Sequence, residues 1–228
     1  MKAMILAAGR GERLRPVTDR LPKPLLEVGG KPLLAWHLER LAAAGFREVV
    51  INVSHFAQLI VERVGNGTAF GLSIAYSHEQ QPLETAGGIA RARARLGEAP
   101  FLLVNGDVYC ECDFARLRAE VLGQRLANLV LVPNPPHRPQ GDFSLEAGSV
   151  GNGAGARYTY AGIAVMSPAL VEGVEPGTRA PLAPLLRAAA ENGRIAGELY
   201  HGIWQDVGTI ERLAALDALL AARHGARS

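Results

Sequence analysis

Cysteine is scarce in this sequence, which contains only two, Cys110 and Cys112, separated by a single residue. Two cysteines are too few for a disulfide framework and, without other clustered ligands, for a zinc site. Long apolar runs are also missing, because the run over residues 3–8 is shorter than the apolar part of a signal peptide or a membrane span. We therefore expect a cytoplasmic protein with no membrane partner.

Lysine is almost absent as well, with only Lys2, Lys23 and Lys31 in the whole chain. The 24 basic residues are mostly arginines, and they are interspersed with 22 acidic residues to give a net charge of +2. A nucleic-acid partner usually requires a block of Lys and Arg, so we expect none. A lysine that falls inside a motif is correspondingly more informative here.

Short apolar runs alternate with helix-like segments through the first 132 residues. We expect strands at 3–8, 48–53, 72–77, 101–105 and 128–132, and helices at 32–44, 57–64, 86–96 and 114–122. Such alternation is typical of βαβ units. The predicted fold class is therefore α/β, with a Rossmann-like, mixed but mainly parallel sheet flanked by helices.

The alternation of apolar runs and helix-like segments ends at residue 133. The proline-rich stretch 133–141 that follows cannot form a regular helix or a central strand. A glycine-rich stretch at 148–157 predicts a hairpin or loop. Beyond it we expect strands at 160–166 and 195–200 and helices at 181–192 and 209–223. We predict one domain over residues 1–228, in which residues 133–228 extend the sheet of residues 1–132.

The loop after the first expected strand reads LAAGRGERLRP over residues 6–16, followed by Thr18 and by PKPLL at 22–26. Small residues and glycines let backbone N–H groups approach a phosphate chain, and Arg13 and Lys23 supply the opposite charge. Leu14 stands where a dinucleotide-binding fingerprint needs its third glycine, and no P-loop GK[ST] is present. For Gly9 and Gly11 alone, a plain glycine-rich turn remains an alternative.

The combined string from Leu6 to Pro32 resembles the signature of the nucleoside-diphosphate-sugar pyrophosphorylases, or sugar-1-phosphate nucleotidyltransferases. The resemblance implies the nucleotide-diphospho-sugar transferase fold and the Mg²⁺-dependent transfer of a nucleoside monophosphate to a sugar 1-phosphate, with release of pyrophosphate. It implies that Arg13 neutralises the β- and γ-phosphates and that Lys23 contacts the phosphates at the reacting centre. The loop residues that would hold the nucleotide are Leu6, Ala7, Ala8, Gly9 and Gly11.

Two aspartates are candidate metal ligands. Asp107 lies just beyond the apolar run 101–104, at the carboxyl end of an expected strand where ligands bind in open α/β sheets. Magnesium prefers one or two carboxylates together with substrate phosphates and water. Asp206, in WQDVGT, resembles the family's late aspartate, which completes the metal site. A plain turn at Asp107 and a helix cap at Asp206 remain alternatives.

Two further segments carry the resemblance into the pocket. ETAGG at 84–88 resembles the family's base-recognising segment, and TYAGI at 159–163 resembles the strand that lines its sugar pocket. Without the resemblance, Tyr160 would be interpreted as a core aromatic residue. The resemblance assigns further nucleotide contacts to Glu84, Thr85, Gly87 and Asn105. It assigns the sugar phosphate to Asn105, Asp142, Tyr160, Gly162 and Asp206. Residues 1–132 would then be the nucleotide-binding half, and residues 133–228 the sugar-binding half with the C-terminal helix.

One family feature is missing, a Glu-Lys-Pro segment that contacts the sugar and its phosphate, and no lysine follows Lys31. Arg157 is one candidate replacement. LETAGGI, LLVNGDV, APLLRAA and WQDVGT resemble the members that transfer UMP from UTP to N-acetylmuramate 1-phosphate in peptidoglycan recycling. Mannose-1-phosphate guanylyltransfer, glucose-1-phosphate uridylyl- or thymidylyltransfer, and a silent sugar-nucleotide sensor remain alternatives. We expect a monomer or small homo-oligomer with UTP and a sugar 1-phosphate as partners.

Overall fold

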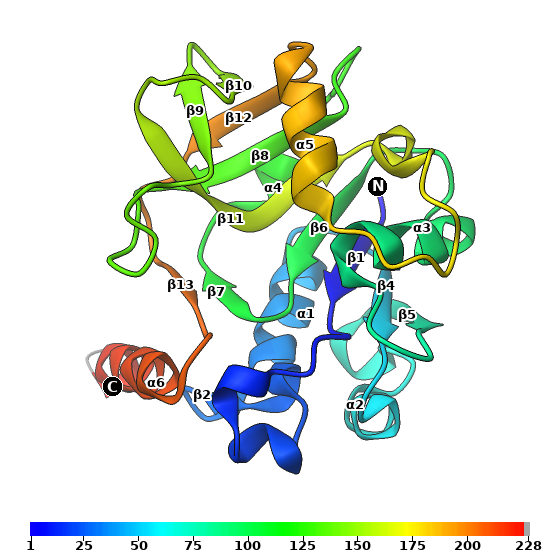
Figure 1. Ribbon diagram of the computed structural model, residues 1–228. Coiled ribbons are helices and arrows are strands. Elements are labelled where there is room, and N and C mark those ends of the chain that lie inside the picture. Colours follow the sequence, from blue (N-terminus) through cyan, green and yellow to red (C-terminus); the bar gives the residue numbers. More distant parts are fainter. Residues whose placement is uncertain (226–228) are drawn as a thin grey trace.

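The computed structural model describes residues 1–225, which form one nine-stranded sheet with helices on both faces (Figure 1). The strands are β1 (Ala3–Leu6), β4 (Glu48–Val53), β5 (Ser73–His78), β6 (Phe101–Asn105), β8 (Ala127–Val132), β9 (Phe143–Glu146), β10 (Ser149–Gly151), β11 (Arg157–Met166) and β12 (Ile195–Leu199). Their order is β5-β4-β1-β6-β11-β8-β12-β10-β9. The expected α/β fold class is confirmed.

Parallel pairing joins β5, β4, β1 and β6, and it joins β8 to β12. Strand β11 runs antiparallel to both β6 and β8, and the β9–β10 hairpin is also antiparallel. The sheet is therefore mixed, and its run of parallel strands belongs to the first half of the chain. The proline-rich residues 133–141 form the connection between β8 and β9.

Two apolar layers cover the sheet, and alternate residues of each strand point to opposite layers, as the period of two requires. Ala3 and Ile5 of β1 belong to one layer, with side chains of α1 (Leu33–Ala43), α2 (Ala57–Val64) and α4 (Phe114–Arg118). Met4 belongs to the other, with side chains of α3 (Glu84–Leu96) and α5 (Leu182–Glu191).

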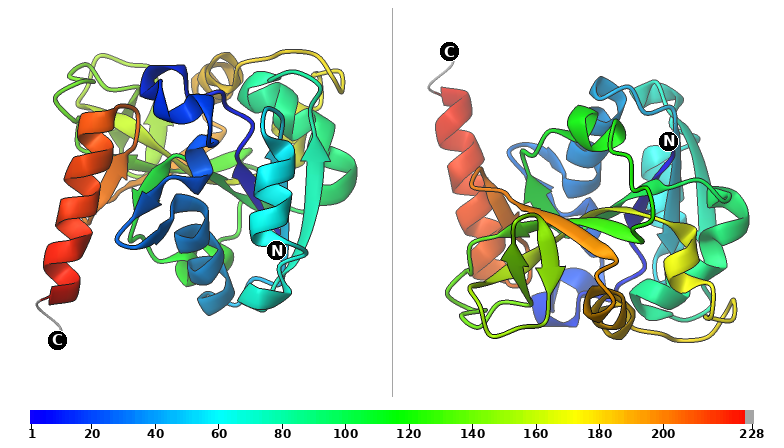
Figure 2. Two further views of the ribbon diagram at one scale, coloured as in Figure 1. Left: turned by 90° about the horizontal axis from the view of Figure 1, so that it is seen from below. Right: turned by 90° about the horizontal axis from the view of Figure 1, so that it is seen from above.

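The C-terminal helix α6 (Ile210–Gly225) lies outside these two layers (Figure 2). Its Leu216 and Leu220 are buried together with Val28 and Tyr109 in a third, smaller cluster. It packs on the short hairpin of β2 (Glu27–Val28) and β3 (Lys31–Pro32) and near β13 (Trp204–Asp206). No helix within residues 1–225 is both long enough and apolar enough to cross a membrane.

Several elements differ from the expectations. Helix α3 begins at Glu84 instead of residue 86, and its first turn is tied to a distant segment, since Ala86 and Gly87 donate backbone hydrogen bonds to Ala180. Helix α4 ends at Arg118 instead of residue 122. Residues 204–206, for which the sequence predicts no strand, form β13 and pair antiparallel with β7 (Val108–Cys110). Each difference arises from a local end effect or a long-range contact.

A buried histidine on α1, His37, lies close to Val108 at the start of β7. His37, on α1, is 2% exposed, and neither ring nitrogen has a hydrogen-bond partner of normal geometry among the described residues. The pKa of His37 is lowered from 6.5 to about 4, chiefly by burial and to a smaller extent by the charge of Arg40, whereas the Val108 backbone and Asp107 act in the opposite direction. The ring is therefore neutral in the folded protein at neutral pH.

The free energy of unfolding should therefore decrease as the pH is lowered below 6.5, the ordinary pKa of histidine. In this range the histidine of the unfolded chain binds a proton, whereas folded His37 stays neutral until about pH 4. Between pH 7.5 and 5 this residue should account for a loss of about 2 kcal/mol. Urea unfolding at both pH values measures the loss. His37→Leu should flatten the pH dependence, whereas the exposed control His55→Leu should retain it. Equal slopes for wild type and His37→Leu would contradict the assignment.

Candidate active site

A cavity of about 890 Å³ opens where β1, β4 and β6 end, at the edge of the sheet where the carboxyl ends of its parallel strands meet. Its walls come from seven separate segments of the chain. They are residues 6–14, Lys23 with Pro24, Asn52, residues between 79 and 85, Asn105 with Asp107, Arg179 and Gly208.

Most of the nucleotide residues expected from the sequence line this cavity. They are Leu6, Ala7, Ala8, Gly9, Gly11, Arg13, Lys23, Glu84, Thr85 and Asn105. Gly87 does not line it. Its N–H group donates to Ala180, and a Cβ atom there would lie 2.2 Å from the Thr178 carbonyl oxygen. Gly87 therefore lets α3 approach residues 178–180.

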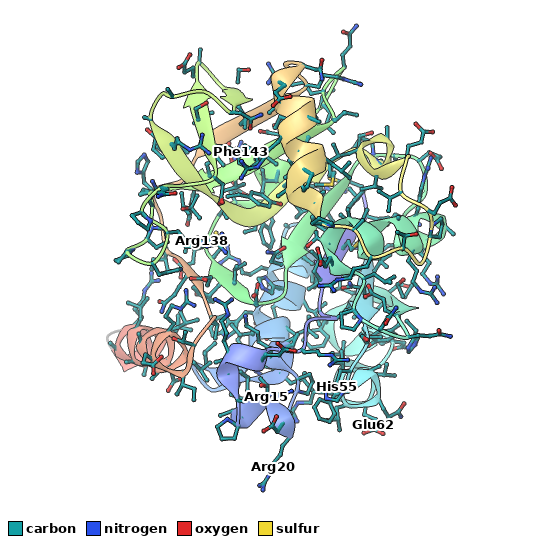
Figure 3. The ribbon with its side chains drawn as sticks, viewed as in Figure 1. Arg15, Arg20, His55, Glu62, Arg138 and Phe143 are labelled. Atoms are coloured by element: carbon teal, nitrogen blue, oxygen red, sulfur yellow. The ribbon has the colours of Figure 1, made fainter. Side chains whose placement is uncertain are left out.

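The loop after β1 is held by Thr18, which lies between residues 6–16 and residues 22–26 of the signature. Gly11 has a φ of +67°, and a Cβ atom at this position would lie 2.9 Å from Cγ2 of Thr18. The Thr18 hydroxyl donates to the Gly11 carbonyl at 2.9 Å. By contrast, Arg15 of the same signature pairs with Asp19 outside the cavity (Figure 3).

Lys23 and Asp107 form the ion pair at the centre of the cavity. Lys23 begins the short 3₁₀ helix η3 (Lys23–Leu25), and its flanking residues Pro22 and Pro24 restrict the backbone. Its ammonium nitrogen lies 2.5 Å from Oδ2 of Asp107. The Lys23 side chain is 10% exposed and that of Asp107 is 40% exposed, so the carboxylate remains open to the cavity.

Asp206 is brought beside Asp107 by the backbone. It pairs with Val108 in the β7–β13 sheet, and the N–H group of Val207 donates to the Asp107 carbonyl at 2.8 Å. Its carboxylate accepts two bonds from Nη1 of Arg212, at 2.9 and 2.7 Å, and lies 3.1 Å from Nε2 of His137. The side chain thus faces a second cavity and does not line the first one.

The helix-cap alternative for Asp206 does not hold. The side chain that accepts a hydrogen bond from the Arg212 backbone N–H is that of Thr209. Within the described residues, no group of three or more His, Cys, Asp and Glu side chains could hold a metal. A cation beside Asp107 and Asp206 would therefore complete its shell with phosphate oxygens and water, and such an oxygen donor set fits Mg²⁺.

Arg212, which the sequence did not suggest, extends its guanidinium group towards the first cavity. Gly208 lines that cavity, and a Cβ atom there would lie 2.0 Å from Nη2 of Arg212 and 3.5 Å from Nη2 of Arg13. Two guanidinium groups thus meet at one glycine. Positive charges held this close together are suited to an anion such as phosphate.

The second cavity, of about 630 Å³, lies between the β8–β9 connection and β13. Prolines of that connection and Trp204 form its apolar walls. Arg212, His137 and His201 add nitrogen atoms to its lining, and Asp206 lines it next to Arg212 and His137. Trp204 is fixed by a hydrogen bond from its indole nitrogen to the Ala161 carbonyl at 2.9 Å.

Three of the residues expected to bind the sugar phosphate, Asp142, Tyr160 and Gly162, line neither cavity. Asp142 accepts a hydrogen bond from the Tyr160 backbone at 2.9 Å and pairs with Arg138, which lies in the β8–β9 connection (Figure 3). The Tyr160 ring is packed with the core, and burial raises the pKa of its hydroxyl. The core interpretation of Tyr160 therefore describes the structure better.

Gly162 supports the site indirectly. It lies where the register between β11 and β8 shifts, has a φ of +75°, and a Cβ atom there would lie 2.5 Å from Nδ2 of Asn105. Asn105 can therefore line the first cavity only because residue 162 has no side chain. Arg157, a candidate for the sugar phosphate, instead donates to the backbone carbonyls of Asp142, Asn152 and Gly153.

Among the cavity residues that the sequence did not suggest are Asn52, Glu79, Gln81 and Arg179. Asn52 had a recognisable signal, since it is a polar residue inside the otherwise apolar strand β4. Glu79 directly follows β5 and is only 5% exposed. Arg179 pairs with Glu84 at 2.7 Å, and Glu84 adopts a φ of +60°, which is strained for a residue with a side chain.

Residues 2–143 match the family model described as nucleotidyl transferase. The chain is 50% identical to the N-acetylmuramate alpha-1-phosphate uridylyltransferase of Neisseria meningitidis serogroup B, over 97% of this chain and 99% of that protein. It is 34% identical to the protein of the same name from Caulobacter vibrioides, over 96% of each. It is 32% identical to the mannose-1-phosphate guanyltransferase of Schizosaccharomyces pombe, over 91% of this chain and 61% of that protein.

Solved structures share the fold. A candidate glucose-1-phosphate thymidylyltransferase from Bacillus anthracis, crystallised with sucrose, superposes with a TM-score of 0.86 at 21% identity, over 97% of this chain and 95% of that one. HddC from Yersinia pseudotuberculosis with GMP-PN superposes with a TM-score of 0.77 at 23% identity, over 96% and 98%. The family model spans more than half of the chain, and the relatives align along almost all of it. The chain therefore belongs to the nucleotidyl transferase family.

Proposed function

We propose that this protein is a sugar-1-phosphate nucleotidyltransferase that transfers UMP from UTP to N-acetylmuramate 1-phosphate and releases pyrophosphate. The observation that carries the proposal is the 50% identity to a uridylyltransferase of that name over 97% of this chain and 99% of the relative. The glycine loop and the Lys23–Asp107 pair in one cavity support nucleotide chemistry there.

The proposed reaction is an in-line displacement. An oxygen of the sugar phosphate attacks the α-phosphorus of UTP, the bond to the bridging oxygen breaks, and pyrophosphate leaves with that electron pair. The acceptor is already an anion, so no protein base is needed, and catalysis reduces to positioning and charge neutralisation. Lys23 would stabilise charge at the reacting phosphate, and Arg13 would bind the phosphates that leave.

Asp107 and Asp206 would hold Mg²⁺, which when bound neutralises phosphate charge and orients the phosphate oxygens. Their neighbouring backbone positions support this role, since Asp107 directly precedes β7 and Asp206 ends β13. Arg212 already contacts Asp206 and meets Arg13 at Gly208. We infer that Arg212 supplies to the acceptor phosphate the charge that a lysine supplies in many relatives.

The wider setting is proposed on the same basis. The protein would act in the cytoplasm in peptidoglycan recycling, as a monomer or small homo-oligomer, without a nucleic-acid or membrane partner. Residues 1–228 would form one domain, with the nucleotide bound by residues 1–132 and the sugar by residues 133–228. The second cavity, lined by Trp204 and Arg212, is the part of the sugar-binding half that best suits a bulky, anionic sugar.

UTP with N-acetylmuramate 1-phosphate should be the best substrate pair, by at least about tenfold in kcat/KM. A site built to pair with the lactyl carboxylate leaves its donors unpaired when the acceptor lacks that group. Pyrophosphate release, measured with four nucleotides and several sugar phosphates, tests this. Equal turnover of GTP with mannose 1-phosphate, or of UTP or dTTP with glucose 1-phosphate, would establish an alternative transferase. Binding without any release of pyrophosphate would establish a sensor.

Asp107→Asn and Asp206→Asn should each lower kcat/KM by about 30- to 1,000-fold, equivalent to about 2–4 kcal/mol, because each removes a charge needed at the transition state. The double variant should be little worse than either single one, since the two carboxylates act together. Asp19→Asn, exposed and outside the cavity, is the control. Full activity in EDTA, or in either single variant, would rule out the metal assignment.

Lys23→Ala should lower the rate constant of the chemical step more than any other lysine substitution. It removes the point charge that η3 directs into the cavity, and the half-exposed Asp107 can be hydrated in its place, so folding should survive. Single-turnover kinetics and thermal unfolding together test both statements. Lys31→Ala, on the exposed Glu39 pair, is the matched control. Turnover of Lys23→Ala within about threefold of wild type would disprove the role.

A further inference from the structure

A chain of three buried hydrogen bonds runs beneath the cavity. The N–H group of Ala7 donates to Oδ1 of Asn52 at 2.8 Å, and Nδ2 of Asn52 donates to Oε1 of Glu79 at 2.7 Å. The second oxygen of Glu79 accepts from the N–H group of Leu83 at 2.9 Å. Asn52 and Glu79 are 3% and 5% exposed. The chain thus links the glycine loop to the residue that precedes α3.

The hydrogen-bonding capacities in this chain match in only one orientation. The amide of Asn52 must present its oxygen to Ala7 and its nitrogen to Glu79, because a flipped amide would oppose donors to donors. Both oxygens of Glu79 are engaged by N–H donors. A buried polar group left unpaired costs more than a bond contributes, so this arrangement is strongly specified.

Helix α3 is shaped around the same two side chains. A Cβ atom at Gly88 would lie 2.8 Å from Oε1 of Glu79 and 2.9 Å from Nδ2 of Asn52. On another side, Gly87 is in contact with Thr178. Two successive glycines weaken a helix by about 1 kcal/mol each relative to alanine. The two glycines allow the first turns of α3 to pack against Asn52 and Glu79 on one side and against Thr178 on the other.

We infer that Asn52 and Glu79 are positioning residues for nucleotide binding. They hold the loop of Ala7 and Ala8 at a set distance from the start of α3, where Glu84 and Thr85 line the cavity. This inference rests on the proposed function, in which residues 1–132 bind UTP, and both segments line the first cavity. Every polar side-chain atom of Asn52 and Glu79 already has a protein partner, so their contribution is the spacing of the walls.

Reversing the central hydrogen bond tests the inference. In Asn52→Asp two buried carboxylates oppose each other, and in Glu79→Gln the new amide must oppose a donor. Each single variant should therefore raise the KM for UTP by about tenfold, the scale of one buried hydrogen bond lost. The KM for the sugar phosphate should stay within about threefold of wild type, and kcat likewise, because the reacting groups are untouched.

The double variant Asn52→Asp/Glu79→Gln restores all three bonds with the same total charge. The introduced carboxylate accepts from Ala7 and from the introduced amide, whose oxygen accepts from Leu83. Its KM for UTP should return to within about threefold of wild type. Gln58→Glu/Glu62→Gln, the same exchange in an exposed hydrogen-bonded pair on α2, is the control and should change nothing.

UTP binding measured by calorimetry without any acceptor separates this inference from the proposed function. If pyrophosphate release fails but the double variant recovers the UTP affinity that the single variants lose, the positioning role holds and the proposed reaction does not. If the double variant folds, as shown by thermal unfolding, but stays as weak as the single variants, Glu79 acts through its own charge and the inference is overturned. Single variants that bind UTP as wild type does would also overturn it.

Discussion

Two aspartates that the backbone holds at adjoining positions impose the main constraint on this site. Asp107 and Asp206 adjoin because β7 and β13 pair and Val207 donates to the Asp107 backbone. Each carboxylate has its own cation, Lys23 for Asp107 and Arg212 for Asp206. Lys23 lines the first cavity and Arg212 lines the second, where phosphate charge would arrive. Negative charge in the protein therefore pre-arranges the positive charge that an anionic substrate needs.

The sheet explains why these groups can meet. The ends of β1, β4 and β6 deliver the glycine loop, Asn52 and Asn105 to one edge through parallel pairing alone. Asp206 instead comes from the far end of the chain, beyond a second half in which parallel and antiparallel pairs are mixed. Gly162 couples the two halves, because the shift in β11 at this residue makes room for Asn105. The packing of the second half thus affects the shape of the first cavity.

The features that could be predicted from the sequence are those that depend on residues close together in the chain. Alternating apolar runs indicated the strands and helices, and the string around Gly9, Arg13 and Lys23 indicated residues that line the first cavity. Strand β13 could not be predicted, because its three residues become a strand only by pairing with β7. The role of Gly87 depends on a contact with Thr178, and that of Tyr160 on burial in the core. The sequence alone does not reveal whether a glycine or a tyrosine faces a bound ligand or packs against another part of the protein.

Asn52 and Glu79 show how a buried polar group can be detected even when its partners cannot. An amide in an otherwise apolar strand must find partners, since burying it unpaired would cost about 1–3 kcal/mol. The sequence therefore indicated that a partner exists, but only the fold identifies it. Because the two segments that this pair connects are walls of the same cavity, the need to pair a buried amide and the need to space two loops are met by the same three hydrogen bonds. Arg212 likewise serves two purposes, since it compensates the charge of Asp206 and also lies close to Gly208, which lines the first cavity.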